Sequence, residues 1–119
     1  MFSFLRPSTG PACPPVSEIV AAMARGEMQL VDVRDTGELR ASGKAKGAIH
    51  ISLGLLALKA DPNAPDTMLK MGVPVVLYCA SGARSGMAAQ MLARMGYGPV
   101  WNLGGLGDWI AGGGQVERV

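Results

Sequence analysis

The sequence predicts a single α/β domain whose parallel β-sheet has helices on both faces. Short apolar runs, rich in valine, isoleucine and leucine, alternate along the chain with segments in which apolar residues recur at helical spacing. Strands that alternate with helices in this way form a parallel sheet, and the helices cover its two faces. The length of 119 residues, with 49% hydrophobic and 17% charged residues, is typical of one compact globular domain.

The first half of the domain is expected to contain two helical segments and two strands. The first helix has Ser17 as its expected N-cap and Gly26 as its expected C-cap. The stretch MQLVDVR follows and is expected to form a buried strand that ends in charged residues. In chain order, the expected elements are a helix over residues 18–25, a strand around 30–33, a short strand within 47–52, a helix-like segment over 53–59 and a loop over 61–65.

The second half begins with a strand rich in β-branched residues, which starts after Pro74. The helix that follows carries four apolar residues on one face and ends at Gly96; the four are Ala88, Met91, Leu92 and Met95. In chain order, the expected elements are a strand over residues 75–78, this helix over 85–95, a strand over 100–102 and a short helix over 106–111.

Residues 1–11 are expected to form a flexible N-terminal arm, and residues 12–119 the folded domain. The N-terminal stretch MFSFLRPSTGPACPP lacks the basic region and the apolar run of a secretory signal. No apolar run approaches the ~18 residues that a membrane-spanning helix needs. We therefore expect a cytoplasmic protein that has no membrane partner.

Charge and cysteine content argue against further classes. The net charge of +2, without a block of like charges and with few aromatic residues, gives no indication of a nucleic-acid partner. Cys13 and Cys79 do not form a Cys-x-x-Cys pair, and one histidine leaves too few ligands for a zinc site. We therefore expect no metal and no cofactor. Two cysteines in a reducing compartment favour thiol chemistry or simple packing over a disulfide.

The most informative residue is Cys79, which lies where a strand passes into a helix. Ligands of parallel α/β sheets bind outside the carboxyl ends of the strands, so this thiol is well placed to meet one. The turn can direct backbone N–H groups inward as an anion-binding nest, with Gly82 permitting the backbone angle and Arg84 adding positive charge. Each of these features lowers the pKa of a cysteine, which predicts a thiolate nucleophile.

The candidate site comprises Cys79 as the catalytic residue and the loop that follows it as the substrate-binding segment. The alternative is that Cys79 is only a small buried residue that ends a strand. The loop residues are Ala80, Ser81, Gly82, Ala83, Arg84 and Ser85.

Asp32 and Arg34 end a neighbouring strand and are predicted to support the site by tying the loop through hydrogen bonds. Pairing of Arg34 with Glu38 is the alternative. His50 is expected to be a partly buried imidazole with a satisfied hydrogen bond. The expected roles of other residues are solvation or steering of an anionic donor for Lys44 and Lys46, core packing for Trp101 and Trp109, and an incidental or resolving thiol for Cys13.

These motifs together resemble the single-domain rhodaneses, or sulfurtransferases, over about residues 12–114. The strongest is Cys-x-x-Gly-x-Arg-Ser after a strand, within VVLYCASGARS at residues 75–85. The others are LVDVRD at 30–35, Glu38, GAIHI at 47–51 and GYGPVWNLGGLGDW at 96–109. The resemblance implies a five-stranded parallel sheet, with the fifth strand near residues 11–16. It also implies that Cys79 aligns with the family's catalytic cysteine and residues 80–84 with the loop that holds its persulfide.

The resemblance implies a sulfurtransferase reaction. The cysteine attacks a sulfane sulfur donor, a small anion such as thiosulfate, and passes the sulfur to cyanide, a thiol or a protein acceptor. The chain departs from the family where GKAKGA at residues 43–48 replaces the common GHIPGA, and where Ser52 replaces a frequent proline.

Two other functions are alternatives to the sulfurtransferase. One is a phosphatase or arsenate reductase of the cysteine–arginine loop type, whose loops have five residues between cysteine and arginine, whereas this chain has four. The other is a rhodanese-like module that carries sulfur or binds a partner.

Overall fold

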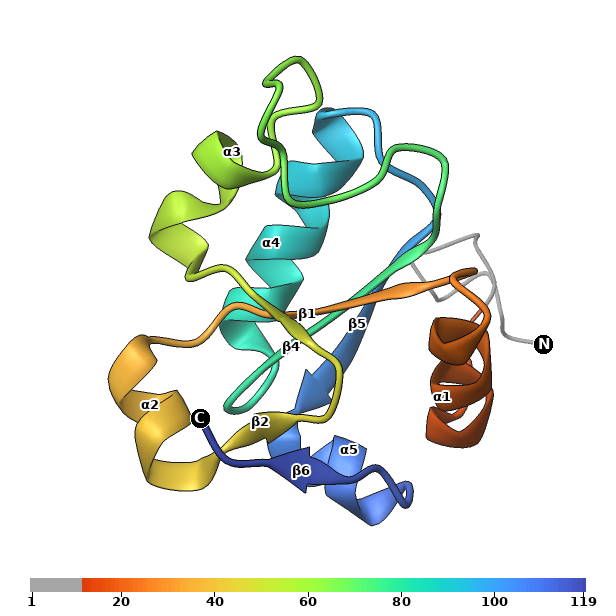
Figure 1. Cartoon of the computed structure of the whole chain (residues 1–119), viewed down its shortest axis with the longest axis vertical. Coiled ribbons are helices and arrows are strands. Elements are labelled where there is room, and N and C mark those ends of the chain that lie inside the picture. The colour runs from red at the N-terminus through yellow and green to blue at the C-terminus, as the bar shows by residue number, and fades with distance from the viewer. Residues whose placement is uncertain (1–11) are drawn as a thin grey trace, which may run out of the picture.

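The computed structural model describes residues 12–119. Figure 1 shows a central sheet between helices, with α3 and α4 on one side and α1 on the other. The elements are α1 (Val16–Ala24), β1 (Gln29–Asp32), α2 (Thr36–Ser42), β2 (Lys44–Ala45), β3 (Ile49–His50), the 3-10 helix η2 (Leu53–Leu55), α3 (Leu56–Lys59), β4 (Val75–Cys79), α4 (Ala83–Arg94), β5 (Val100–Gly105), α5 (Leu106–Ala111) and β6 (Val116–Glu117).

The central sheet has four parallel strands in the order β3-β1-β4-β5. Because the strands are parallel, β1 and β4 end at the same edge, with Asp32 opposite Tyr78 in the register. The register between β4 and β5 shifts by one residue just before Cys79, because Leu77 pairs with Asn102 and Tyr78 with Gly104. The site residues therefore meet at one edge of the sheet, as expected for this class of fold.

The prediction of a fifth strand near residues 11–16 is wrong for the residues that the structure describes. Residues 12–15 have no regular structure and α1 begins at Val16, while residue 11 and the predicted arm over residues 1–11 lie outside the described range. The extra pairing lies elsewhere, where β2 and β6 form a separate antiparallel ribbon that sequence patterns did not predict. Strands of two residues are too short to show a period.

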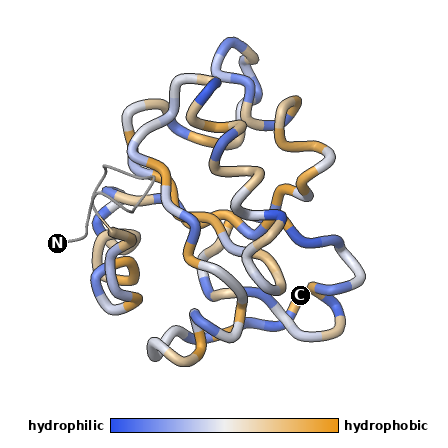
Figure 2. The backbone as a smooth tube through the Cα atoms, turned by 180° about the vertical axis from the view of Figure 1, so that it is seen from behind, coloured by the Kyte–Doolittle hydropathy of each residue, from blue (hydrophilic) through white to orange (hydrophobic). Residues whose placement is uncertain are grey.

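The core is divided by the sheet into two apolar clusters. Figure 2 shows hydrophobic segments running through the middle of the molecule and hydrophilic segments in the outer loops. The cluster on the α3 and α4 side includes Val31, Leu56, Leu77, Cys79, Ala88 and Leu92. The cluster on the α1 and α5 side includes Ile19, Leu30, Val76, Tyr78 and Trp109. Alternate residues of β4 thus face opposite clusters, which confirms helices on both faces.

Most helix predictions are confirmed, with shifted ends. The helix α1 starts earlier than expected because the carbonyl of Pro15, not Ser17, accepts the first helical hydrogen bonds. Gly26 follows its last turn at a φ of +73°, as a C-terminal glycine should. The helix α5 has the predicted bounds. The helix α2, which sequence patterns missed, begins with a capping box between Asp35 and Glu38.

Candidate active site

Cys79 is the last residue of β4, and its side chain is almost fully buried, with 1% of the residue exposed. Its Sγ accepts a hydrogen bond from the backbone N–H of Gly82 at 3.0 Å and lies 3.4 Å from the hydroxyl of Ser85. Gly82 adopts a φ of +106°, which favours glycine and turns the chain into α4 directly after the thiol. A Cβ at this position would also come within 3.2 Å of Gly104 Cα.

The loop stabilises the thiolate form of Cys79. Burial alone would raise the pKa of the thiol, but the hydroxyl of Ser85 and the backbone N–H groups of Ser85, Ser81 and Gly82 outweigh it. The net result is a pKa lowered to about 7. A large fraction of the protein therefore carries a nucleophilic sulfur anion at neutral pH.

Asn102, on β5, connects the loop to the neighbouring strand, and sequence reasoning missed it. Its Nδ2 donates to the carbonyl of Gly82 at 2.9 Å, while its Oδ1 accepts from the backbone N–H of Gly104 at 3.0 Å. These two contacts fix which end of the amide is the acceptor. The same Oδ1 lies 2.7 Å from the Ser85 hydroxyl, so Asn102 and the Cys79 sulfur share one hydroxyl proton.

The end of β5 packs directly against the loop. A side chain at Gly105 would collide with the carbonyl of Ala80, and Gly104 has a φ of +116°. Glycine at both positions permits this approach. The Gly-Gly pair in NLGGLGDW was therefore the sequence signal that this end of β5 packs against the loop.

Arg84 is present at the loop, but its charge is paired. Its two terminal nitrogens donate to the two carboxylate oxygens of Glu38 at 2.7 and 2.8 Å, and each side chain is 33% exposed. This contact, together with the backbone N–H of Asp35, lowers the pKa of Glu38 to about 2. The Glu38 carboxylate in turn raises the pKa of Arg84. The alternative pairing of Arg34 with Glu38 is therefore wrong.

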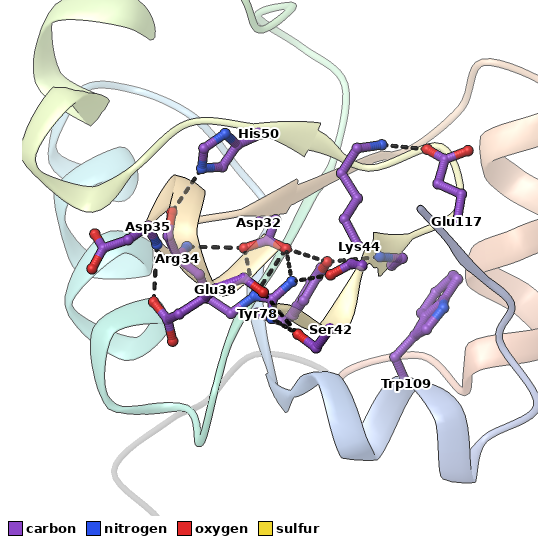
Figure 3. Close-up of polar contacts among 12 residues, drawn as sticks. Asp32, Arg34, Asp35, Glu38, Ser42, Lys44, His50, Tyr78, Trp109 and Glu117 are labelled. Carbon is purple, nitrogen blue, oxygen red and sulfur yellow. Dashed lines mark hydrogen bonds and ion pairs between the residues drawn. The ribbon is translucent and has the colours of Figure 1, made fainter. Parts of the chain in front are cut away.

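Asp32 and Arg34 form a buried ion pair beneath β2. Figure 3 shows the Asp32 carboxylate between Arg34 and Tyr78, whose hydroxyl donates to it. Arg34 also donates to the carbonyl of Gly43 at 2.6 Å, and the Tyr78 hydroxyl accepts from the backbone N–H of Ala45 at 2.9 Å. These hydrogen bonds anchor the segment before and within β2. They give the pair a structural role, and among the described residues its hydrogen bonds run to the segment around β2, to His50, Ser52 and Tyr78, and not to residues 80–85.

The other residues singled out in the sequence, His50, Lys44 and Cys13, make contacts that hold the fold together. His50 Nε2 lies 2.7 Å from the carbonyl of Arg34, so the expectation of a satisfied imidazole is confirmed. Lys44 is ion-paired with Glu117 of β6. Cys13 is half-buried against the cluster on the α1 and α5 side, and burial raises its pKa, so it is not an incidental exposed thiol. It belongs to the cluster across the sheet from Cys79, which argues against a resolving thiol.

Within residues 12–119, no helix combines the length and apolar composition that crossing a membrane requires. In the same range, no three histidine, cysteine, aspartate or glutamate side chains gather as a metal site would need.

The family model for the rhodanese-like domain matches residues 15–111. A protein of Allochromatium vinosum described as a sulfurtransferase is 36% identical over 84 residues, which cover 70% of this chain and 72% of that protein. An uncharacterized Bacillus subtilis protein, YqhL, is 37% identical over 90 residues and 75% of this chain, which spans only 64% of its length.

Two solved structures are similar over most of the chain. The human single-domain sulfurtransferase TSTD1 has a TM-score of 0.69 at 28% identity, covering 86% of this chain and 97% of that one. A Rhodopseudomonas palustris protein of unknown function, described as a possible tyrosine phosphatase, has a TM-score of 0.72 at 33% identity, covering 86% and 81%.

Proposed function

This chain belongs to the rhodanese-like domain family, and we propose that it is a sulfurtransferase that carries sulfur as a persulfide on Cys79. The observation that supports this best is the surroundings of the sulfur. A buried Sγ receives hydrogen bonds from a backbone N–H and lies beside a hydroxyl, and its pKa is lowered to about 7. A sulfur anion held by neutral donors is suited to attack an electrophilic sulfur and then to hold a second one.

In the proposed reaction, the Cys79 thiolate attacks the outer sulfur of a sulfane donor. A new S–S bond forms while the donor's S–S bond breaks, and the rest of the donor leaves with the electron pair, as sulfite when thiosulfate is the donor. A thiolate or cyanide then attacks the outer persulfide sulfur and releases the Cys79 thiolate. The N–H groups around the loop stabilise one negative charge before and after each transfer.

The phosphatase alternative is disfavoured by the size and chemistry of the loop. A phosphoryl group brings three equatorial oxygens that each require donors. Four residues separate Cys79 from Arg84, and two of them, Ala80 and Ala83, offer no side-chain donor. In addition, the two donor nitrogens of Arg84 that face Glu38 are already occupied. We therefore expect no hydrolysis of p-nitrophenyl phosphate above background.

Mass spectrometry of the intact protein tests the proposal. Excess thiosulfate should add ~32 Da, one sulfur, and cyanide or dithiothreitol should remove it. A Cys13→Ser background restricts the adduct to Cys79, and Cys79→Ser should prevent it. Unchanged mass with every sulfane donor tried, or full transfer activity in the Cys79→Ser protein, would show the mechanism to be wrong. Phosphate hydrolysis without persulfide formation would support the phosphatase.

A further inference from the structure

Beside the candidate site, the guanidinium of Arg84 is accompanied by two carboxylates, those of Glu38 and Asp35. Arg84 directs both terminal nitrogens at Glu38, at 2.7 and 2.8 Å, and the Asp35 carboxylate lies on the same turn of α2, where it accepts the backbone N–H of Glu38. These three side chains together carry a net charge of −1. Glu38 is held in place because it also accepts the backbone N–H of Asp35 at 2.9 Å, as Figure 3 shows.

The part of a donor that leaves must lie outside the ring of N–H groups, because those groups surround the Cys79 sulfur. The loop on that side carries the exposed alanines Ala80 and Ala83, followed by Arg84, which is ion-paired with Glu38 of α2. Thiosulfate carries two negative charges and the Cys79 thiolate carries one. Three negative charges are therefore close together during the attack, and two of them leave on sulfite. A persulfide donor, R–S–S⁻, brings one charge of its own, so two gather and one leaves on the thiolate R–S⁻, apart from any charge on R.

We propose that Glu38, together with Asp35, determines donor specificity by selecting persulfides whose carrier group R is neutral or cationic over anionic donors such as thiosulfate. In the transfer, Cys79–S⁻ and R–S–S⁻ give Cys79–S–S⁻ and R–S⁻, which balances atoms, charge and electrons. Pairing with Glu38 neutralises the guanidinium that would otherwise attract a dianion, and Asp35 adds repulsion. This inference rests on the proposed sulfurtransferase function.

Two donors of matched size and opposite charge measure this specificity. Cysteamine persulfide has a cationic carrier group and 3-mercaptopropionate persulfide an anionic one, and thiosulfate is the third donor. We expect kcat/KM to favour the cationic persulfide over the anionic one. In Glu38→Gln this preference should fall by about tenfold, since one unit charge is removed from the rim. High salt should reduce the preference in the unchanged protein.

The variants are chosen to keep the fold. Glutamine at position 38 preserves the capping box of α2, and Asp35→Asn, a second variant, keeps a favourable N-cap and should also reduce the preference. Glu27→Gln is the matched control, because it removes the same charge from an exposed pair with Arg25 that precedes β1 at the opposite edge of the sheet. Equal preferences in the unchanged protein, Glu38→Gln and Glu27→Gln would overturn the proposal.

A second measurement does not require sulfur transfer. In the Cys13→Ser background, iodoacetamide and iodoacetate alkylate Cys79 with reagents that differ in one negative charge. The ratio of their rates should favour neutral iodoacetamide and should shift toward iodoacetate by about tenfold in Glu38→Gln, but not in Glu27→Gln. An unchanged ratio overturns the specificity role even if persulfide forms. A shifted ratio without any persulfide supports the charge effect and refutes the sulfurtransferase.

Discussion

Replacement of Ser85 by alanine should raise the pKa of Cys79. Ser85 is fully buried, and its hydroxyl is the largest of the contributions that lower this pKa. A hydrogen bond to a charged group contributes about 1.5–3 kcal/mol, and 1.36 kcal/mol corresponds to one pKa unit, so its loss is worth about one to two units. The hydroxyl proton is also shared with Asn102 Oδ1 at 2.7 Å and the Gly104 carbonyl at 3.3 Å.

Because of this sharing, we expect the lower end of the range. The midpoint should move up by about one unit, and the thiolate fraction at pH 7 should fall from about one half to about one tenth. The rate of alkylation by iodoacetamide, measured against pH in the Cys13→Ser background, gives the midpoint directly. At pH 7 the rate should fall about fivefold, while the plateau at high pH should change little.

Ser17→Ala is the control, because Ser17 is exposed in the first turn of α1 and belongs to the opposite layer. An unchanged midpoint in Ser85→Ala would refute the reasoning. It would mean that the backbone N–H groups alone set the pKa and that the hydroxyl proton stays on Asn102.

Two further predictions concern stability. The pKa of Cys79 is lowered on folding from 9.0 to about 7, so folding releases protons in this range. The free energy of unfolding in urea should therefore rise as pH increases from 7 to 9, and this gain should be complete above pH 9 and absent below pH 7; Cys79→Ser should remove it. Tyr78→Phe deprives the Asp32 carboxylate of a donor and the Ala45 N–H of its acceptor. It should cost about 1–3 kcal/mol of stability in urea unfolding and leave the alkylation midpoint of Cys79 unchanged.

The sequence predicted those parts of the molecule that short-range patterns determine. The apolar face of α4 has a helical period, and Ala88 and Leu92 are buried where that period places them. The Cys79 loop could be recognised because a strand, a glycine and a helix start follow one another within a few residues. The start of α4 at Ala83 was missed by two residues, since Gly82 itself is the N-cap.

Side-chain partners that are far apart in sequence could not be predicted. Glu38 and Arg84 are separated by 46 residues, and the sequence suggested the nearby Arg34 as the partner of Glu38 instead. Asn102 lies within the recognised segment 96–109, but its contact with Ser85 depends on β5 lying next to β4 and could not be predicted. The pairing of β2 with β6 likewise depends on the return of the C-terminal segment to β2, which no local pattern encodes.

The site stabilises its sulfur with dipoles, while the nearby guanidinium groups are paired. Within the described residues, Asp32 pairs with Arg34 and Glu38 with Arg84, so the sulfur of Cys79 is stabilised chiefly by N–H and O–H groups. Such donors respond to one negative charge on sulfur, whether a thiolate or a persulfide carries it. For the proposed transfer this keeps the two states close in free energy, because a donor array of fixed strength stabilises both. A free cation would instead favour binding of a dianion and slow the departure of sulfite. Pairing Arg84 with Glu38 therefore suits a carrier that must both accept sulfur and release it.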